Sequence, residues 1–230
     1  ADLADRWTVE LDAAVAEAAG PVGFSPSDVP GSGITQDELD RIALESPGAQ
    51  VWPLTPLQTG LFYQSGLLRG GEMDAYHIQA CVRFGGDVDV DRLRTAVDAL
   101  PAHHEVLRSG FRQIDAGVVA VVPAAVSVPL RVVDLGHLDE AVAGEQIAEI
   151  ADAERAERFD LASPPLMRAV LVRHGGGADL VVTSHHILFD GWSGPLVLAD
   201  LLAVYATGTP YTPIHERSFA DHVRAIARTD

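Results

Sequence analysis

An apolar run that ends in two adjacent histidines constrains this chain more than any other segment. Residues 180–183 read Leu-Val-Val-Thr and lead into His185 and His186, which Asp190 and Gly191 follow. Such a run, bounded by a turn, predicts a half-buried strand that ends at the mouth of a cleft. Because adjacent side chains on a strand point to opposite faces, the two imidazoles cannot both face one substrate. We expect one histidine to be catalytic and the other structural.

Three kinds of site fit this segment on its residues alone. Zinc needs three or four ligands, but the single cysteine, Cys81, is distant in sequence and only residues 103–105, His-His-Glu, could add to the set. A core histidine held by backbone groups, with an aspartate that caps the turn, is the ordinary structural alternative. Acid–base or charge-stabilising catalysis is favoured, because histidine titrates at about pH 6.5 and a nearby carboxylate fixes its ring or a neighbouring arginine. No metal is expected.

Four ordered segments resemble the condensation domains of nonribosomal peptide synthetases. Residues 185–191, HHILFDG, fit the HHxxxDG signature of that family. WPLTPLQTGLFY at residues 52–63 resembles its opening motif. HHEVLRSGF at residues 103–111 resembles its RHxxLRxxF segment, with His103 where the family more often has arginine. Residues 159–168 are similar to the stretch that precedes the double histidine in these domains.

The resemblance implies an α/β fold like that of chloramphenicol acetyltransferase, with a mixed β-sheet flanked by helices. It also implies an acyltransferase-type enzyme that forms an amide bond between a donor acyl or peptidyl thioester and an acceptor aminoacyl thioester. The implied partners are an upstream donor and a downstream acceptor peptidyl carrier protein, whose phosphopantetheine arms hold the substrates. No directly bound cofactor is expected. Such an enzyme works in the biosynthesis of antibiotics and other secondary metabolites.

The resemblance also implies roles for individual residues. His186 is the catalytic candidate, which orients the acceptor amine and stabilises or deprotonates the tetrahedral intermediate. His185 is then structural. Asp190 is expected to hold structure through an ion pair with Arg108, and Gly191 to leave room for close backbone approach.

Residues beyond the signature are expected to support the site. Trp192 and Ser193 either line the substrate tunnel or pack beneath the turn, and packing is favoured for Trp192. The histidines at residues 103–104 are expected to form scaffold near the site. Asp221 and His222 are expected on a helix surface.

Composition excludes several partners. A net charge of −17 argues against nucleic acid, whose binders have basic stripes. No apolar run reaches membrane-spanning length and no signal peptide opens the chain, so we expect a cytoplasmic protein without a membrane partner. All 16 basic residues are arginine, which excludes lysine Schiff-base chemistry.

The organisation along the chain predicts a fragment of a larger enzyme. Residues 1–48 read as a linker with the tail of an upstream domain, including a helix over residues 2–19 and a segment rich in Gly, Pro and Ser over residues 21–33. Residues 49–230 read as the N-terminal lobe of a condensation domain without its C-terminal lobe. Because both lobes form the tunnel, the fragment is expected to be inactive alone.

Hydrophobic periodicity places the motifs on helices and strands. Thr35 and Glu38 predict a capping box for a helix. The three glycines at residues 175–177 predict the turn of a hairpin. The expected helices cover residues 35–45, 55–68, 91–102, 139–158 and 195–205, and the expected strands cover residues 76–84, 107–112, 118–122, 130–133, 166–173 and 179–186.

Three other functions remain open on the sequence. An epimerisation domain shares the double histidine, but there the residues after the glycine usually read Val-Ser-Trp, whereas residues 192–194 read Trp-Ser-Gly. A free CoA-dependent acyltransferase of the same superfamily would use HxxxDG without an upstream linker. A non-catalytic docking module for carrier proteins is the third.

Overall fold

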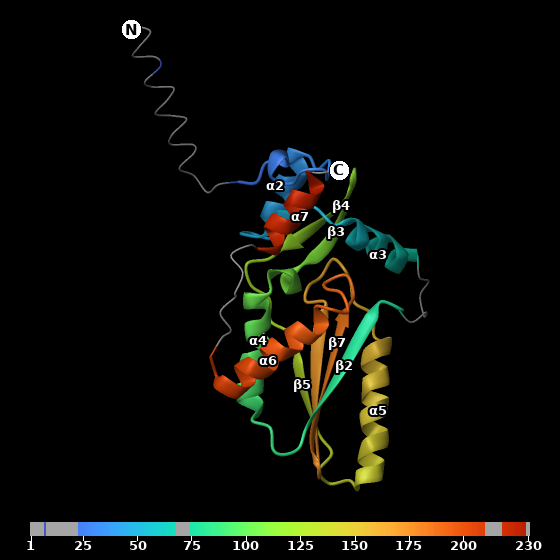
Figure 1. Ribbon diagram of the computed structural model, residues 1–230. Helices are drawn as coiled ribbons and strands as arrows, with labels where there is room; N and C mark the ends of the chain where they lie inside the picture. The colour runs from blue at the N-terminus through green and yellow to red at the C-terminus, as the bar shows by residue number, and fades with distance from the viewer. Residues whose placement is uncertain (1–6, 8–22, 68–73, 210–217, 229–230) are drawn as a thin grey trace.

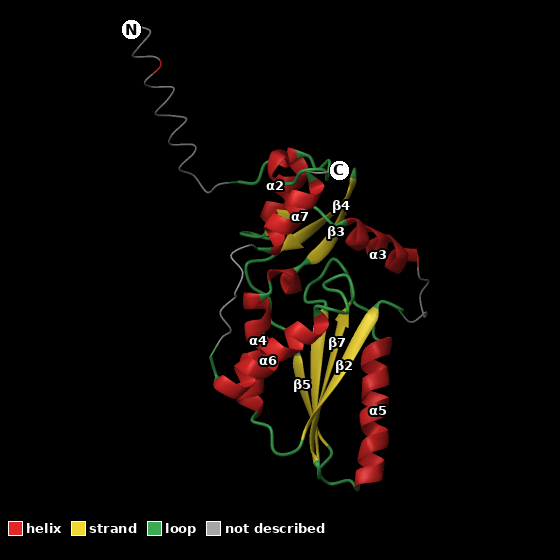
Figure 2. Cartoon of the chain, in the orientation of Figure 1, coloured by secondary structure: helices red, strands yellow, loops and turns green. Residues whose placement is uncertain are grey.

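The computed structural model describes residues 7, 23–67, 74–209 and 218–228. These residues form two β-sheets with helices packed around them (Figures 1 and 2). The helix expected over residues 2–19 lies outside the described residues apart from Trp7. In chain order the elements are η1 Pro26–Asp28, α2 Gln36–Glu45, β1 Gln50–Trp52, α3 Pro56–Leu67, β2 His77–Phe84, α4 Val90–His103, η2 Glu105–Arg108, β3 Gly110–Ile114, β4 Gly117–Val122, β5 Leu130–Asp134, α5 Glu140–Ala156, β6 Met167–His174, β7 Gly177–His185, α6 Gly194–Thr207 and α7 Phe219–Ala227.

The larger sheet has the strand order β2-β7-β6-β5. β2 and β6 run antiparallel to β7, whereas β5 is parallel to β6. β6 and β7 form the predicted hairpin, whose last register pair joins His174 to Gly177. At the other end of β7, His185 lies opposite His77 of β2. The strand predicted before the double histidine is therefore confirmed, and it ends at the first of the two histidines.

Alternating residues along β6 divide the core between the two faces of this sheet. Ala169 and Leu171 pack in the main core, together with the buried residues of α4 and α6. Val170 and Val172 point the other way and pack in a separate cluster with α5. Figure 1 shows α5 beside β2 and away from α4 and α6. The mixed sheet flanked by helices is thus confirmed.

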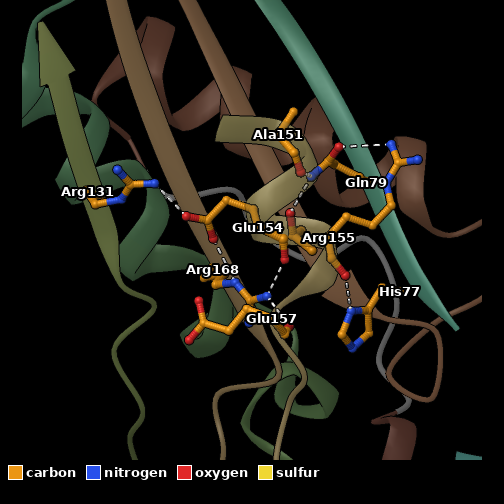
Figure 3. Close-up of polar contacts among 9 residues, drawn as sticks. His77, Gln79, Arg131, Ala151, Glu154, Arg155, Glu157 and Arg168 are labelled. Carbon is orange, nitrogen blue, oxygen red and sulfur yellow. Dashed lines mark hydrogen bonds and ion pairs between the residues drawn. The ribbon is translucent and has the colours of Figure 1, made fainter. Parts of the chain in front are cut away.

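Polar contacts fix the C-terminal half of α5 to the sheet (Figure 3). The carboxylate of Glu154 accepts hydrogen bonds from Arg131 at 2.7 Å and from Arg168 at 2.8 Å. Arg168 also donates to carbonyl oxygens at the end of the helix, which have no partner within the helix itself. The ring of His77 bonds the carbonyl oxygen of Arg155 at 2.8 Å. These contacts tie α5 to the strands that lead to the double histidine.

The smaller sheet has the order β1-β4-β3 and contributes to two clusters. Trp52 and Phe111 pack in the main core from one face. Val119 and Val121 face the opposite side, where they pack against α2. Figure 1 shows α2 and α7 next to this sheet, above the larger one.

The segment predicted as a linker is packed in its described part. Val29 and Ile34 are 1% and 4% exposed, and both belong to the cluster formed by α2 and the smaller sheet. The predicted capping box is present, because Thr35 N–H donates to Glu38 at 2.8 Å. Glu38 also accepts the backbone amide of Asp115 at 2.9 Å, at the turn between β3 and β4. Residues 23–45 are therefore docked on this sheet, a tertiary contact that the Gly, Pro and Ser composition did not predict.

The strand predicted over residues 107–112 is shorter than expected. Residues 105–108 form the 3₁₀ helix η2, and β3 begins at Gly110. Arg108 holds this turn, because its guanidinium donates to the carbonyl oxygens of Pro101 at 2.6 Å and Pro123 at 2.9 Å.

None of the helices in the described part of the chain combines the length and the apolar character needed to cross a bilayer.

Candidate active site

His185 ends β7 with its side chain buried in the protein. Its Nδ1 accepts the backbone amide of Ile187 at 3.1 Å. Because Nδ1 accepts, the proton of the neutral ring lies on Nε2, which is 3.0 Å from the Ser65 hydroxyl and 3.5 Å from the Asp74 carboxylate. Burial lowers the pKa of His185 to about 4, against the opposing attraction of Asp74. His185 is therefore neutral at physiological pH and is built into the fold.

His186 points to the other face of the strand end and has the opposite tautomer. Its backbone amide donates to Tyr76 at 2.8 Å, which extends the pairing of β7 with the start of β2. Its Nδ1 lies 2.9 Å from the carbonyl oxygen of Phe189. A carbonyl only accepts, so Nδ1 carries the proton and Nε2 keeps a lone pair. The half-buried His186 ring lines a cleft.

This cleft has a volume of about 550 Å³ and lies between elements that are distant in sequence. It is bounded by the start of α3, the residues around η2, the loop after β7, the start of α6, and α7. Gln58 of α3 helps to fix the loop, because its amide donates to the carbonyl oxygen of Ile187 at 3.2 Å. The lining residues are Thr55, Leu57, Gln58, Leu61, His104, Val106, His186, Ile187, Leu188, Phe189, Asp190, Ser193, Leu196, Val197, Phe219 and His222.

Asp190 holds the turn into α6. The expectation that it forms an ion pair with Arg108 is wrong. Its carboxylate accepts the backbone amide of Ser193 at 2.8 Å and the Ser193 hydroxyl at 2.7 Å. These hydrogen bonds lower the pKa of the Asp190 carboxyl. Arg108 is instead directed to backbone carbonyls and to Glu105 at 3.7 Å. Asp190 remains exposed, so its role in the structure is local.

The sequence favoured packing of Trp192 beneath the turn. This prediction is wrong, because the Trp192 side chain is 89% exposed. Ser193 lines the cleft and forms the cap at the start of α6. A Cβ added to Gly191 would meet no atom within 4 Å. Within the described residues nothing approaches this glycine closely.

Two further imidazoles line the cleft. His104 lies beside it with Nε2 at 2.8 Å from the carboxylate of Asp200 on α6, whereas His103 bonds its own helix through the carbonyl of Ala99. His222 of α7 is exposed, as expected, but it also borders the cleft. The matched segment at residues 103–111 was the signal for His104. The sequence placed His222 only on a helix surface, because its position beside the cleft depends on how α7 packs.

The cleft offers a proton acceptor in the ring of His186. Within the part of the chain that the structure describes, no group of at least three His, Cys, Asp or Glu side chains is placed to hold a metal ion. The Nε2 lone pair of His186 can bind or remove a proton from a substrate in the cleft.

This α/β lobe, with its histidine at the end of a central strand, has the chloramphenicol acetyltransferase-like fold. Residues 48–229 match the family described as the condensation domain. The chain belongs to this family, which occurs in nonribosomal peptide synthetases.

Curated relatives are much longer than this chain. It is 33% identical over 182 residues to phosphinothricin tripeptide synthetase PhsC of Streptomyces viridochromogenes, covering 76% of this chain and 17% of that protein. It is also 30% identical over 187 residues to vanchrobactin synthetase VabF of Vibrio anguillarum, covering 79% of this chain and 6% of that protein.

Solved structures have the same fold. The epimerization domain from the third module of tyrocidine synthetase B superimposes with a TM-score of 0.66 at 21% identity, covering 76% of this chain and 39% of that one. SgcC5 of Streptomyces globisporus gives a TM-score of 0.61 at 27% identity, covering 76% of this chain and 42% of that one. The chain thus spans less than half of each of these structures.

Proposed function

We propose that this chain contributes the histidine-bearing lobe of a condensation domain that forms an amide bond. The donor is an acyl or peptidyl thioester and the acceptor is an aminoacyl thioester, each held on the phosphopantetheine arm of a carrier protein. The observation that supports this function best is the orientation of His186, whose Nδ1 is bound to Phe189 and whose ring lines the cleft.

The reaction needs positioning more than it needs a strong base. An α-amine has a pKa of about 8, so about a tenth of it is neutral at pH 7, and complete deprotonation is worth only about 1.4 kcal/mol. Holding two tethered reactants in place supplies about 7 to 11 kcal/mol. We therefore assign His186 first to orienting the acceptor amine and second to handling its proton.

The proton route follows from the tautomer. The amine nitrogen attacks the donor carbonyl carbon and gives a zwitterionic tetrahedral intermediate. Nε2 of His186 accepts a proton from the new ammonium group, and the intermediate then collapses with cleavage of the C–S bond. The departing thiolate takes a proton, for which the imidazolium of His186 is the nearest donor in this proposal.

The proposed domain boundaries follow the family match. Residues 49–230 form the N-terminal lobe, and residues 1–48 connect it to an upstream domain, although residues 23–45 are docked on the lobe. The cleft faces a second lobe in this proposal, which completes the tunnel. His104 and His222, on the walls of the cleft, are then positioned to contact the carrier arms.

The test is product formation by an intact domain that contains both lobes. Donor and acceptor carrier proteins loaded with aminoacyl groups are mixed with it, and the product on the acceptor is identified by mass spectrometry. We expect a dipeptidyl thioester on the acceptor carrier. The proposal would be contradicted if the aminoacyl groups were only hydrolysed from the carriers or stayed on their original carriers under all conditions.

Epimerisation is the second candidate, favoured by the structural similarity to an epimerization domain. The same assay separates the two functions, because epimerisation changes the configuration of one carrier-bound residue and transfers nothing. Chiral analysis of the recovered amino acids detects it. A D-residue without a new amide bond would replace the condensation proposal.

A further inference from the structure

A second cavity lies behind the loop that carries His186. It has a volume of about 230 Å³ and is lined by strands of the larger sheet and by the start of α6. Most of its walls are apolar, and they include Ile78, Ala80, Met167, Val182 and Leu198. It shares Phe189, Asp190 and Val197 with the cleft. The two spaces therefore adjoin each other.

The rim of this cavity is kept open by two glycines. Gly191 and Gly194 both line it. A Cβ on Gly191 would meet nothing within 4 Å, and a Cβ on Gly194 would come no closer than 3.5 Å, to the ring of Phe189. The backbone thus accepts larger residues at both positions, and the small side chains leave space beside the loop rather than relieve a clash.

The size and the lining select one kind of occupant. Ligand pockets for whole drug-sized molecules measure about 300 to 1,000 Å³, so a cavity of this size suits a single side chain. Two of the polar side chains on its walls have partners elsewhere: Gln79 donates to Ala151 and Thr183, and the carboxylate of Asp190 accepts from Ser193. The hydroxyl of Ser184 is the remaining polar side-chain group of the lining. A polar occupant would lose its hydrogen bonds to water and gain few in return.

We propose that this cavity receives an apolar side chain from one of the two acyl substrates, whose reacting atoms lie in the adjoining cleft. The inference rests on the proposed function and names the substrate class. A leucine-sized or aromatic residue fills the cavity, whereas alanine leaves it empty and aspartate is excluded by its charge. The donor and the acceptor are the two sources of this side chain, and the probes below separate them.

The first experiment measures binding to this chain itself. The probes are stable amide analogues of leucyl, phenylalanyl, alanyl and aspartyl pantetheine thioesters, each with a free amine as in an acceptor or an acetylated amine as in a donor. Methyl NMR signals of Ile78, Ala80 and Met167 report on occupancy. We expect a leucyl probe to shift these signals and to bind about tenfold or more tightly than the alanyl probe. The amine form that binds identifies the source.

Variants make the test specific. Ala80→Ile adds a strand-compatible side chain into the cavity and should remove the preference for the leucyl probe. Leu198→Ala enlarges the cavity and should shift the preference toward a phenylalanyl probe. Cys81→Ile is the matched control, because adjacent residues on β2 point to opposite faces and Cys81 does not line the cavity. Circular dichroism and thermal unfolding verify that each variant is folded.

The outcomes separate this inference from the proposed function. Methyl shifts that appear with the leucyl probe and are lost in folded Ala80→Ile would support binding of the side chain in the cavity. Failure of the intact domain to form an amide bond would overturn only the proposed function. Equal shifts with the aspartyl probe, or an unchanged leucyl preference in both Ala80→Ile and Leu198→Ala, would overturn the cavity. If the intact domain still forms an amide bond in that case, the proposed function would hold without the proposed role of the cavity.

Discussion

The two adjacent histidines differ in what surrounds each ring. His185 accepts an amide proton on Nδ1 and is enclosed by the side chains of Ser65 and Asp74. His186 donates from Nδ1 to Phe189, its ring lines the cleft, and Nε2 has no hydrogen-bond partner among the described residues. The strand period alone predicted that only one ring would face a substrate. The tautomers could not be predicted, because they depend on a loop carbonyl and on a backbone amide two residues away.

His185 should make the fold sensitive to acid. Its pKa is lowered from 6.5 to about 4, so between these values the unfolded chain binds a proton that the folded chain does not. Stability due to this group is present above pH 6.5 and is lost as the pH falls. We expect a loss of about 2 kcal/mol in the free energy of unfolding from pH 7 to pH 5.

Urea unfolding at the two pH values measures this effect. His185→Asn is the control, because its side-chain oxygen can accept the Ile187 amide but does not titrate. Its unfolding free energy should change less with pH than that of the wild type. An equal fall in both proteins would assign the acid sensitivity to other groups.

Asp190 and Arg108 should act independently on stability. Each has separate partners, so removing both should cost the sum of the single changes. Arg108→Ala should be the more destabilising of the two, because it removes the donor to two carbonyl oxygens in part-buried hydrogen bonds, whereas Asp190→Ala removes exposed hydrogen bonds to Ser193. Thermal unfolding of the two single variants and of the double variant tests this. Partial recovery in the double variant would indicate an ion pair after all.

Gly191→Ala tests whether a ligand needs the glycine. The protein itself has space for the added methyl group, so the melting temperature should stay near that of the wild type. If a substrate arm passes along this backbone, the KM in an intact domain should rise while folding is unchanged. Unchanged kinetics would remove Gly191 from the substrate path.

At the scale of elements, local patterns predicted most of the large sheet. The strand that ends in the double histidine, the hairpin turn at residues 175–177 and the helix expected over residues 91–102 are all confirmed. The docking of α2 was missed, because residues 21–33 are rich in turn-forming residues and their contacts are with β3 and β4, far along the chain. Trp192 was placed beneath the turn because aromatic residues usually anchor turns, but the structure leaves it exposed.

The docking of α2 makes a prediction about stability. Leu39 is 3% exposed and packs with Ile42 and Val119. Leu39→Ala should therefore lower the free energy of unfolding by about 2 to 5 kcal/mol. Leu44→Ala is the matched control on the same helix, because Leu44 is 82% exposed, and it should change stability by no more than about 0.5 kcal/mol. Similar melting temperatures for both variants would mean that α2 is a separate linker element.

At the scale of the whole molecule, the cleft lies between elements that are distant in sequence. Its walls come from α3, the loop after β7, α6 and α7, so the sequence could name His186 but not the full lining. In the proposed function the remaining wall comes from a second lobe. We therefore expect the isolated chain to fold without forming an amide bond, and turnover at the rate of an intact domain would refute that expectation.

The role of His186 is tested by the rate of amide formation in an intact two-lobed domain with loaded carrier proteins, compared between wild type and His186→Ala. We expect His186→Ala to lower the rate by about 100-fold or more, as for loss of a proton-transferring group, while its melting temperature stays close to that of the wild type. A folded His186→Ala domain that forms the product at the wild-type rate would contradict the assignment of His186 and, with it, the proposed chemistry of the cleft.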